Sequence, residues 1–110
     1  MTKKEAIQKL IENRALSTNL LKPLGINFES FLKLSQMPKD QAKNTIIRLI
    51  DHFENELINS LGFKNKKELY LDFLNNFLTV SGFAKYFDIN EKTAERLIIN
   101  AKKEYEENHV

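Results

Sequence analysis

The side chains that usually carry out catalysis or bind metal ions are scarce in this sequence. It has no cysteine and only two histidines, His52 and His109. His109 is next to last in the chain, and His52 falls in a long helical pattern, where a solvated histidine is far more common than a metal ligand. We find no glycine-rich phosphate loop, no histidine–carboxylate metal spacing and no serine–histidine arrangement. We therefore expect a protein that is not an enzyme and that uses no cofactor, metal or small-molecule substrate.

The charged residues form alternating blocks. The chain has 17 basic and 15 acidic residues, a net charge of +2. Residues 1–48 carry +5, residues 49–63 carry −3, residues 64–103 carry +3 and residues 104–110 carry −3. Two basic zones separated by an acidic strip suit a polyanion such as nucleic acid. Solvated helix faces in a lysine-rich protein explain the same counts, so charge leaves both interpretations open.

Residues 82–97, Gly-Phe-Ala-Lys-Tyr-Phe-Asp-Ile-Asn-Glu-Lys-Thr-Ala-Glu-Arg-Leu, read as two helices joined by a tight turn. Phe83 and Phe87 are placed to pack the first helix inward, and Ile89 to fill the turn. Ala94 and Leu97 are placed to anchor the second helix. This stretch resembles the helix-turn-helix motif of small DNA-binding proteins, including excisionase-like proteins and phage regulators. The resemblance covers about twenty residues, or thirty-odd with the helix expected over 66–78.

The resemblance implies that the second helix reads the major groove of DNA. The expected contacts on or near that helix are Asn90, Lys92, Thr93, Arg96 and Asn100. The residues expected near the phosphates are Lys66, Lys67, Lys85, Lys102 and Lys103. The sequence departs from the motif at the turn, where Asp88 stands in place of the common glycine, and in Glu91 and Glu95, which would face the same groove as the cations.

The motif is the second copy of an internal repeat. At an offset of 63, residues 3–34 match residues 66–97 without gaps, with eight identities in 32 positions. In the first copy, the third helix is too apolar to face water or DNA. We expect that helix to pack internally, to dimerise or to bind a partner protein through Phe28, Phe31 and Leu32.

The helix start and stop signals predict an all-α fold of about six to seven helices, in which two similar three-helix units are joined by a long central helix. The first helix opens at Thr2 and the fifth at Asn65, each followed three residues later by glutamate. The others are expected over 20–24, 28–36, 39–61, 82–87 (capped by Ser81) and 91–106. Phe73, Leu74, Phe77 and Leu78 are expected on the buried side of the helix that follows Asn65.

Length favours one compact helical domain over 1–110. Within it we expect an N-terminal unit over 1–38 for assembly or partner contact, a connecting helix over 39–62 and a helix-turn-helix-like unit over 63–110. The absence of cysteines and of long apolar runs favours a cytoplasmic protein without a membrane-spanning segment.

Two functions follow from this sequence as hypotheses. The first is a small nucleic-acid-binding accessory or regulatory protein of a bacterial mobile element or phage. The alternative is a non-catalytic interaction subunit that binds a larger replication, conjugation or defence enzyme.

Overall fold

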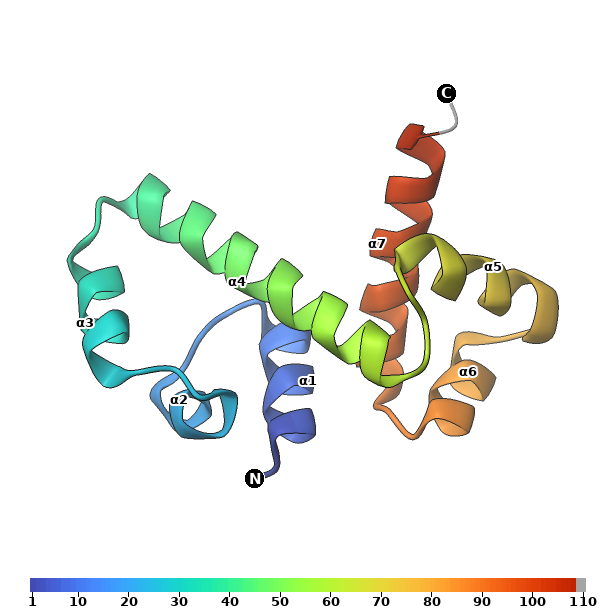
Figure 1. Cartoon of the computed structure of the whole chain (residues 1–110), viewed down its shortest axis with the longest axis horizontal. Coiled ribbons are helices and arrows are strands. Elements are labelled where there is room, and N and C mark those ends of the chain that lie inside the picture. Colours follow the sequence, from blue (N-terminus) through green and yellow to red (C-terminus); the bar gives the residue numbers. More distant parts are fainter. Residues whose placement is uncertain (109–110) are drawn as a thin grey trace. The chain divides into compact units, whose positions relative to one another are not determined.

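The computed structural model describes residues 1–108, which form seven α-helices and no β-strand. This confirms the all-α prediction and the long central helix. The helices are α1 (Lys3–Asn13), α2 (Thr18–Leu24), α3 (Phe28–Gln36), α4 (Lys39–Ser60), α5 (Lys66–Asn76), α6 (Val80–Phe87) and α7 (Glu91–Asn108), shown in Figure 1. None of these described helices is long and apolar enough to cross a membrane.

The chain divides into two compact units, Met1–Phe53 and Glu54–Val110, the second described as far as residue 108. The helix α4 contributes to both, its first fifteen residues to unit 1 and the rest to unit 2. Its apolar positions recur at helical spacing, and those that are buried are Ile50, Phe53, Leu57 and Ile58.

In unit 1, α1 packs against α2. The hydroxyl of Thr2 accepts a hydrogen bond from the backbone N–H of Glu5 at 3.1 Å, so this helix begins where its capping pair predicts. The buried apolar faces of the two helices consist of Ala6, Ile7, Leu10 and Ile11 from α1 and Leu20, Leu21 and Leu24 from α2.

In unit 2, α7 packs against both α5 and α6 (Figure 1). The centre of this core is Phe83, which is 0% exposed. Its ring centroid lies 4.7 Å from that of Phe87, 5.1 Å from that of Phe77 and 5.9 Å from that of Phe73. Edge-to-face and tilted pairs at these separations are the favourable arrangements of aromatic rings.

The helices of the two units follow the internal repeat. Shifting α1 by 63 residues gives the bounds of α5, and shifting the first residue of α3 gives that of α7. Two residues at matching positions, Gly25 and Asp88, both adopt the left-handed conformation, with φ of 74° and 54°. The backbone N–H groups of Ile26 and Ile89 then donate to Leu21 and Ala84 at 2.8 and 3.0 Å. The two units therefore share one turn geometry.

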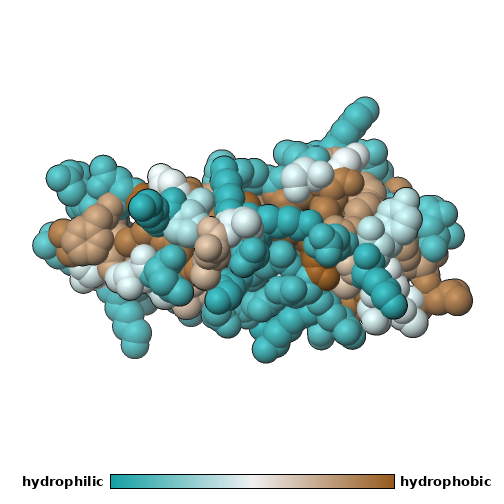
Figure 2. Space-filling model, turned by 90° about the horizontal axis from the view of Figure 1, so that it is seen from below, coloured by the Kyte–Doolittle hydropathy of each residue, from teal (hydrophilic) through white to brown (hydrophobic). Residues whose placement is uncertain are grey.

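Two apolar residues expected in the core are exposed. Leu74 is 53% exposed and Leu78 is 101% exposed. For Leu78 the prediction was wrong because α5 ends at Asn76, so Leu78 no longer follows the helical period that placed it on the buried side. Leu74 lies within α5, on a side of the helix that no other described helix covers. Figure 2 shows apolar surface at the side of unit 2 where the turn between α5 and α6 lies.

The cap of α6 is Thr79 and not Ser81. The Thr79 hydroxyl accepts from the backbone N–H of Gly82 at 3.0 Å, and the helix begins at Val80. An N-cap hydroxyl is worth about 1 kcal/mol. We expect Thr79→Ala to lower the free energy of unfolding by about that amount, and Ser81→Ala, which removes a hydroxyl from an exposed position inside the helix, to change it by less than about 0.5 kcal/mol. Urea unfolding of the two variants measures the difference, and equal losses would contradict the assignment.

Candidate nucleic-acid interface

The turn between α6 and α7 orients the candidate recognition helix. Asp88 occupies the left-handed conformation that the motif usually gives to glycine, which aspartate tolerates better than most residues. Ile89 follows it and is 8% exposed, so its side chain fills the turn as predicted. The backbone carbonyl of Asn90 accepts from the N–H of Ala94 at 2.9 Å, which places Asn90 directly before α7.

One side of α7 is buried against the other helices of unit 2. Ala94 and Ala101 are 0% exposed and Leu97 is 1% exposed. The two alanines present only methyl groups, so α5 and α6 approach the backbone of α7 closely. The opposite side of α7 is therefore the one available to a ligand.

The outward side of α7 carries cations in a row. Lys92, Arg96 and Lys103 are exposed, and their spacings of four and seven residues place them along one side of the helix. None of these three forms an ion pair with another residue in the described part of the chain. Beside them runs a second exposed row that contains Glu91 and Glu95. The other predicted contacts that are exposed are Asn90, Lys67, Lys85 and Lys102.

Sequence reasoning missed Ile99. Its side chain is 52% exposed and lies between the cationic and acidic rows, three residues after Arg96. An outward position on a helix that is occupied by isoleucine was the available signal. An apolar side chain at such a position suits the methyl group of thymine in the major groove.

Thr93 cannot contact a base edge. It is 0% exposed, although it had been expected among the contacts. The expectation was wrong because Thr93 falls on the same side of α7 as Ala94 and Leu97, the side that is sealed against α5 and α6.

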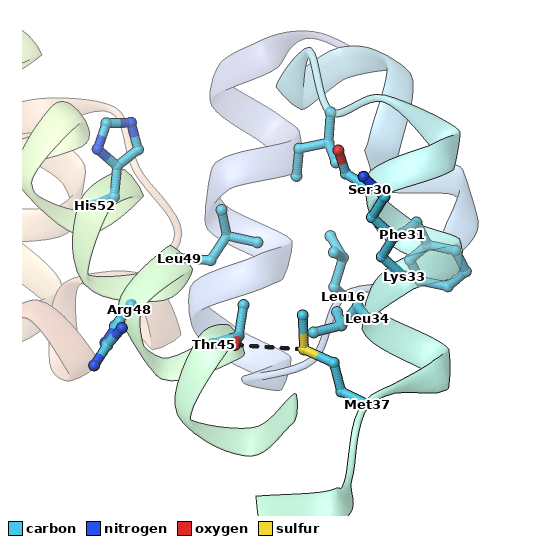
Figure 3. A pocket seen from close by; sticks show the side chains of 11 residues that line it. Leu16, Ser30, Phe31, Lys33, Leu34, Met37, Thr45, Arg48, Leu49 and His52 are labelled. Atoms are coloured by element: carbon cyan, nitrogen blue, oxygen red, sulfur yellow. Dashed lines mark hydrogen bonds between the residues drawn. The ribbon is translucent and has the colours of Figure 1, made fainter. Parts of the chain in front are cut away.

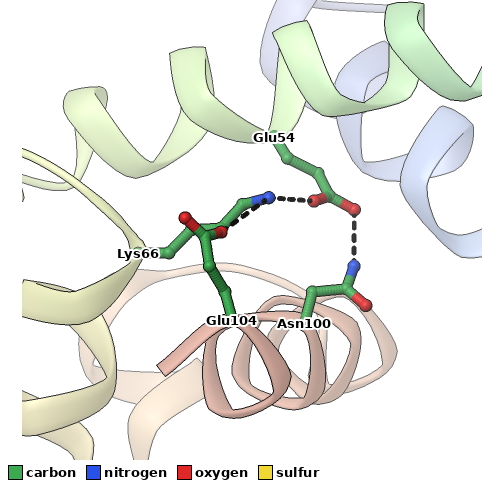
Figure 4. A network of polar contacts seen from close by, with 4 residues as sticks. All are labelled: Glu54, Lys66, Asn100 and Glu104. Atoms are coloured by element: carbon green, nitrogen blue, oxygen red, sulfur yellow. Dashed lines mark hydrogen bonds and ion pairs between the residues drawn. The ribbon is translucent and has the colours of Figure 1, made fainter. Parts of the chain in front are cut away.

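Lys66 and Asn100 belong to a polar network within unit 2 (Figure 4). The Lys66 ammonium lies 3.6 Å from a carboxylate oxygen of Glu54 and 3.6 Å from one of Glu104. The Asn100 amide donates to the other oxygen of Glu54 at 2.9 Å. The side chain of Lys66 is only 12% exposed. Their expected roles at DNA are therefore corrected to structural ones.

The centre of the network, Glu54, was not identified from the sequence. It is 2% exposed and sits between the buried residues Phe53 and Leu57 of α4. The signal was an acidic residue within an apolar stripe, since Glu54 lies one turn after Ile50 and one turn before Ile58.

A second surface lies in unit 1, on α3. None of the residues of α3 is buried. Phe28 is 57% exposed and Leu32 is 42% exposed, while Phe31 is half-buried with its ring centroid 6.2 Å from that of Phe28. Figure 2 shows apolar surface open to solvent over this helix. The three residues predicted to bind a partner are thus accessible on one short helix.

Beside this helix is a pocket of about 470 Å³, which we name the α3 groove. Its lining residues are Leu16, Ile26, Ser30, Phe31, Lys33, Leu34, Met37, Thr45, Arg48, Leu49 and His52. In Figure 3, Leu49 and Thr45 face Leu34 and Met37 across the groove. The side chains of Arg48 and His52, which also line the pocket, extend away from these four residues. The hydroxyl of Thr45 also contacts the sulfur of Met37 at 3.8 Å.

The two histidines were the residues considered for catalysis or metal binding. His52 is exposed and packs its ring edge-to-face with that of Phe53, at a centroid distance of 5.1 Å. No group of three or more histidine, cysteine, aspartate or glutamate side chains among residues 1–108 is arranged to hold a metal ion. His109 lies outside the described residues.

The candidate interfaces are therefore the outward side of α7 and the α3 groove. The chain matches no protein-family model, no curated protein and no solved structure.

Proposed function

We propose that this protein is a small nucleic-acid-binding accessory or regulatory protein of a bacterial mobile element or phage, and that α7 is the helix that binds DNA. The observation that carries the proposal is the exposed row of Lys92, Arg96 and Lys103 on a helix whose opposite side is buried. A rigidly held helix with cations along its outer side has the properties of a major-groove reader.

The exposed polar residues divide into two roles. Arg96 and Lys92 are suited to guanine, whose O6 and N7 atoms accept from such side chains, and the exposed Ile99 is suited to a thymine methyl group. Lys67, Lys85, Lys102 and Lys103 are suited to phosphates, which position the protein without reading sequence. Glu91 and Glu95 repel phosphates but accept from the amino group of cytosine, so they favour sequence-dependent over nonspecific binding.

The test is a titration of the full chain into labelled single- and double-stranded DNA at about 50 and 200 mM salt. Four phosphate contacts, at Lys67, Lys85, Lys102 and Lys103, would lower the affinity by about 10²-fold between these conditions, because each releases bound counterions. We expect salt-sensitive binding at micromolar or lower protein concentration, with duplex preferred over single strands. An absence of binding at about 50 mM salt would show that the proposal is wrong.

A second candidate function is a non-catalytic subunit that binds a larger replication, conjugation or defence enzyme. The observation that favours it is the exposed apolar surface of α3, with Phe28 more than half exposed. Exposed apolar surface rimmed by polar residues is typical of protein interaction sites. Recovery of one defined partner from the native host, together with failure of the DNA titration, would favour this function over the first.

A further inference from the structure

The α3 groove is the place where the first copy of the repeat lacks the core that the second copy has. Ser30, Phe31 and Leu34 line the groove. Their counterparts at an offset of 63 are Thr93, Ala94 and Leu97, which are 0%, 0% and 1% exposed. The same helix face is thus buried in α7 and open in α3.

The matching positions on the two helices differ in side-chain size. Ala94 of α7, which packs against α5, corresponds to Phe31 of α3, and a methyl group lets helices approach more closely than an aromatic ring does. Among the described helices of unit 1, α1 packs against α2, and α3 makes no comparable contact with either. The open face therefore remains available to another molecule.

The charge at the groove has one sign. Of the eleven lining residues, Lys33 and Arg48 are charged and none is acidic. Both cations are exposed, and neither has an ion-pair partner within residues 1–108. Residues 1–48 as a whole carry a net charge of +5. An occupant of this groove meets an apolar floor and cations at its edges.

We propose that the α3 groove binds an amphipathic helix of a partner protein, one that has apolar residues on one side and acidic residues beside them. An apolar cavity of roughly 150 Å³ holds one benzene-sized group, so a pocket of about 470 Å³ has room for two or three side chains. Helix-in-groove recognition uses that number of anchors, spaced by three or four residues. Acidic flanks on the partner helix would pair with Lys33 and Arg48.

The size and charge of the surface favour this occupant over the alternatives. Phe28 and Leu32 are exposed on the same helix outside the pocket, and the ring centroid of Phe28 lies 6.2 Å from that of the lining residue Phe31. A small molecule in the pocket would leave both side chains uncovered. A symmetric dimer through the groove would bring the cations of two copies together, and such like-charge contact is unfavourable. Nucleic acid would satisfy the cations but would leave the two exposed apolar side chains without an apolar partner.

The test uses the full chain and two synthetic peptides of about 18 residues, a length at which helices begin to form in isolation. One peptide has leucines spaced i, i+3, i+4 and i+7 with glutamates beside them, and the other has lysine in place of every glutamate. Fluorescence anisotropy measures their affinities. We expect the acidic peptide to bind about tenfold more tightly than the basic one.

Two charge-reversal variants locate the site. In Lys33→Glu/Arg48→Glu the preference should invert, so that the basic peptide binds more tightly. The matched control is Lys39→Glu/Lys43→Glu, which changes the net charge equally, but at two residues that line a separate pocket on α4. The control should keep the preference for the acidic peptide. Circular dichroism establishes that each variant retains its helices.

A third variant separates this proposal from the DNA-binding one. Phe28→Ser removes an exposed ring from α3. It should lower the affinity for the acidic peptide about tenfold and leave the affinity for DNA unchanged. Equal affinity for both peptides, or equal effects of the two charge reversals, would overturn the proposal. So would a dimer that Phe28→Ser dissociates in sedimentation equilibrium, or a loss of DNA affinity in Lys33→Glu/Arg48→Glu that clearly exceeds the loss in Lys39→Glu/Lys43→Glu.

Discussion

Replacing Glu54 with alanine is expected to lower the free energy of unfolding by about 3–5 kcal/mol. Glu54 is 2% exposed, and its two carboxylate oxygens meet the ammonium of Lys66 at 3.6 Å and the amide of Asn100 at 2.9 Å. The substitution leaves Lys66, whose side chain is 12% exposed, without this carboxylate, and removes an acceptor from Asn100. Domains of this size are stable by about 5–15 kcal/mol, so the loss is a large part of the total.

Urea unfolding at neutral pH measures this effect. The control is Asn55→Ala, which alters the next residue of the same helix at an exposed position and should change the free energy of unfolding by less than about 0.5 kcal/mol. The loss in free energy of unfolding for Glu54→Gln should lie between the losses for these two variants. Glutamine keeps an oxygen that accepts from Asn100, but it lacks the charge that pairs with Lys66. A loss below about 1 kcal/mol for Glu54→Ala would contradict a structural role for the network.

The double substitution Lys92→Ala/Arg96→Ala is expected to weaken DNA binding about 100-fold, if each side chain contributes about 1–3 kcal/mol at a base edge or phosphate. Both residues are exposed and neither pairs with another residue of the described chain. Their removal should therefore leave the thermal midpoint unchanged. The salt dependence should also become shallower, by about one unit of slope for each phosphate contact that is lost.

The matched control for this pair is Lys39→Ala/Lys43→Ala, which removes the same charge from exposed positions of α4 in unit 1. It should reduce the affinity by less than about threefold, since only the long-range attraction changes. Unchanged affinity in Lys92→Ala/Arg96→Ala would exclude α7 as the binding helix. An equal loss in the control would assign the binding to overall charge and not to α7.

The positions of the helices follow from local sequence signals. Thr2 and Asn65 cap their helices as predicted, and Asn27 caps α3 in the same way, with side-chain oxygens that accept from backbone N–H groups two or three residues later. Gly25 and Asp88 end the second helix of each repeat in the left-handed conformation. These features involve atoms only a few residues apart, so a single stretch of sequence contains all the partners they need. Thr79 shows the limit of such signals, because two hydroxyl residues near one helix start compete as the cap.

The candidate interface was predictable only in part. The spacing of Lys92 and Arg96 indicated that they share one side of a helix, and both are exposed. Thr93 is polar, like Lys92 before it, yet it is 0% exposed because it lies on the side of α7 that packs against other helices. A polar residue within an amphipathic helix does not reveal which partner helices cover its side.

Local sequence thus specifies where each helix begins and ends and which positions share a side, because backbone hydrogen bonds and helical periodicity act over a few residues. Only tertiary packing decides which polar side chains remain available. Lys66 and Asn100 are held inside unit 2 because Glu54, distant in sequence, lies between them. The matching residues Phe31 and Ala94 also differ in burial, since Ala94 is 0% exposed and Phe31 is only half-buried. Burial depends on the size and charge of side chains that the fold brings together from separate parts of the chain.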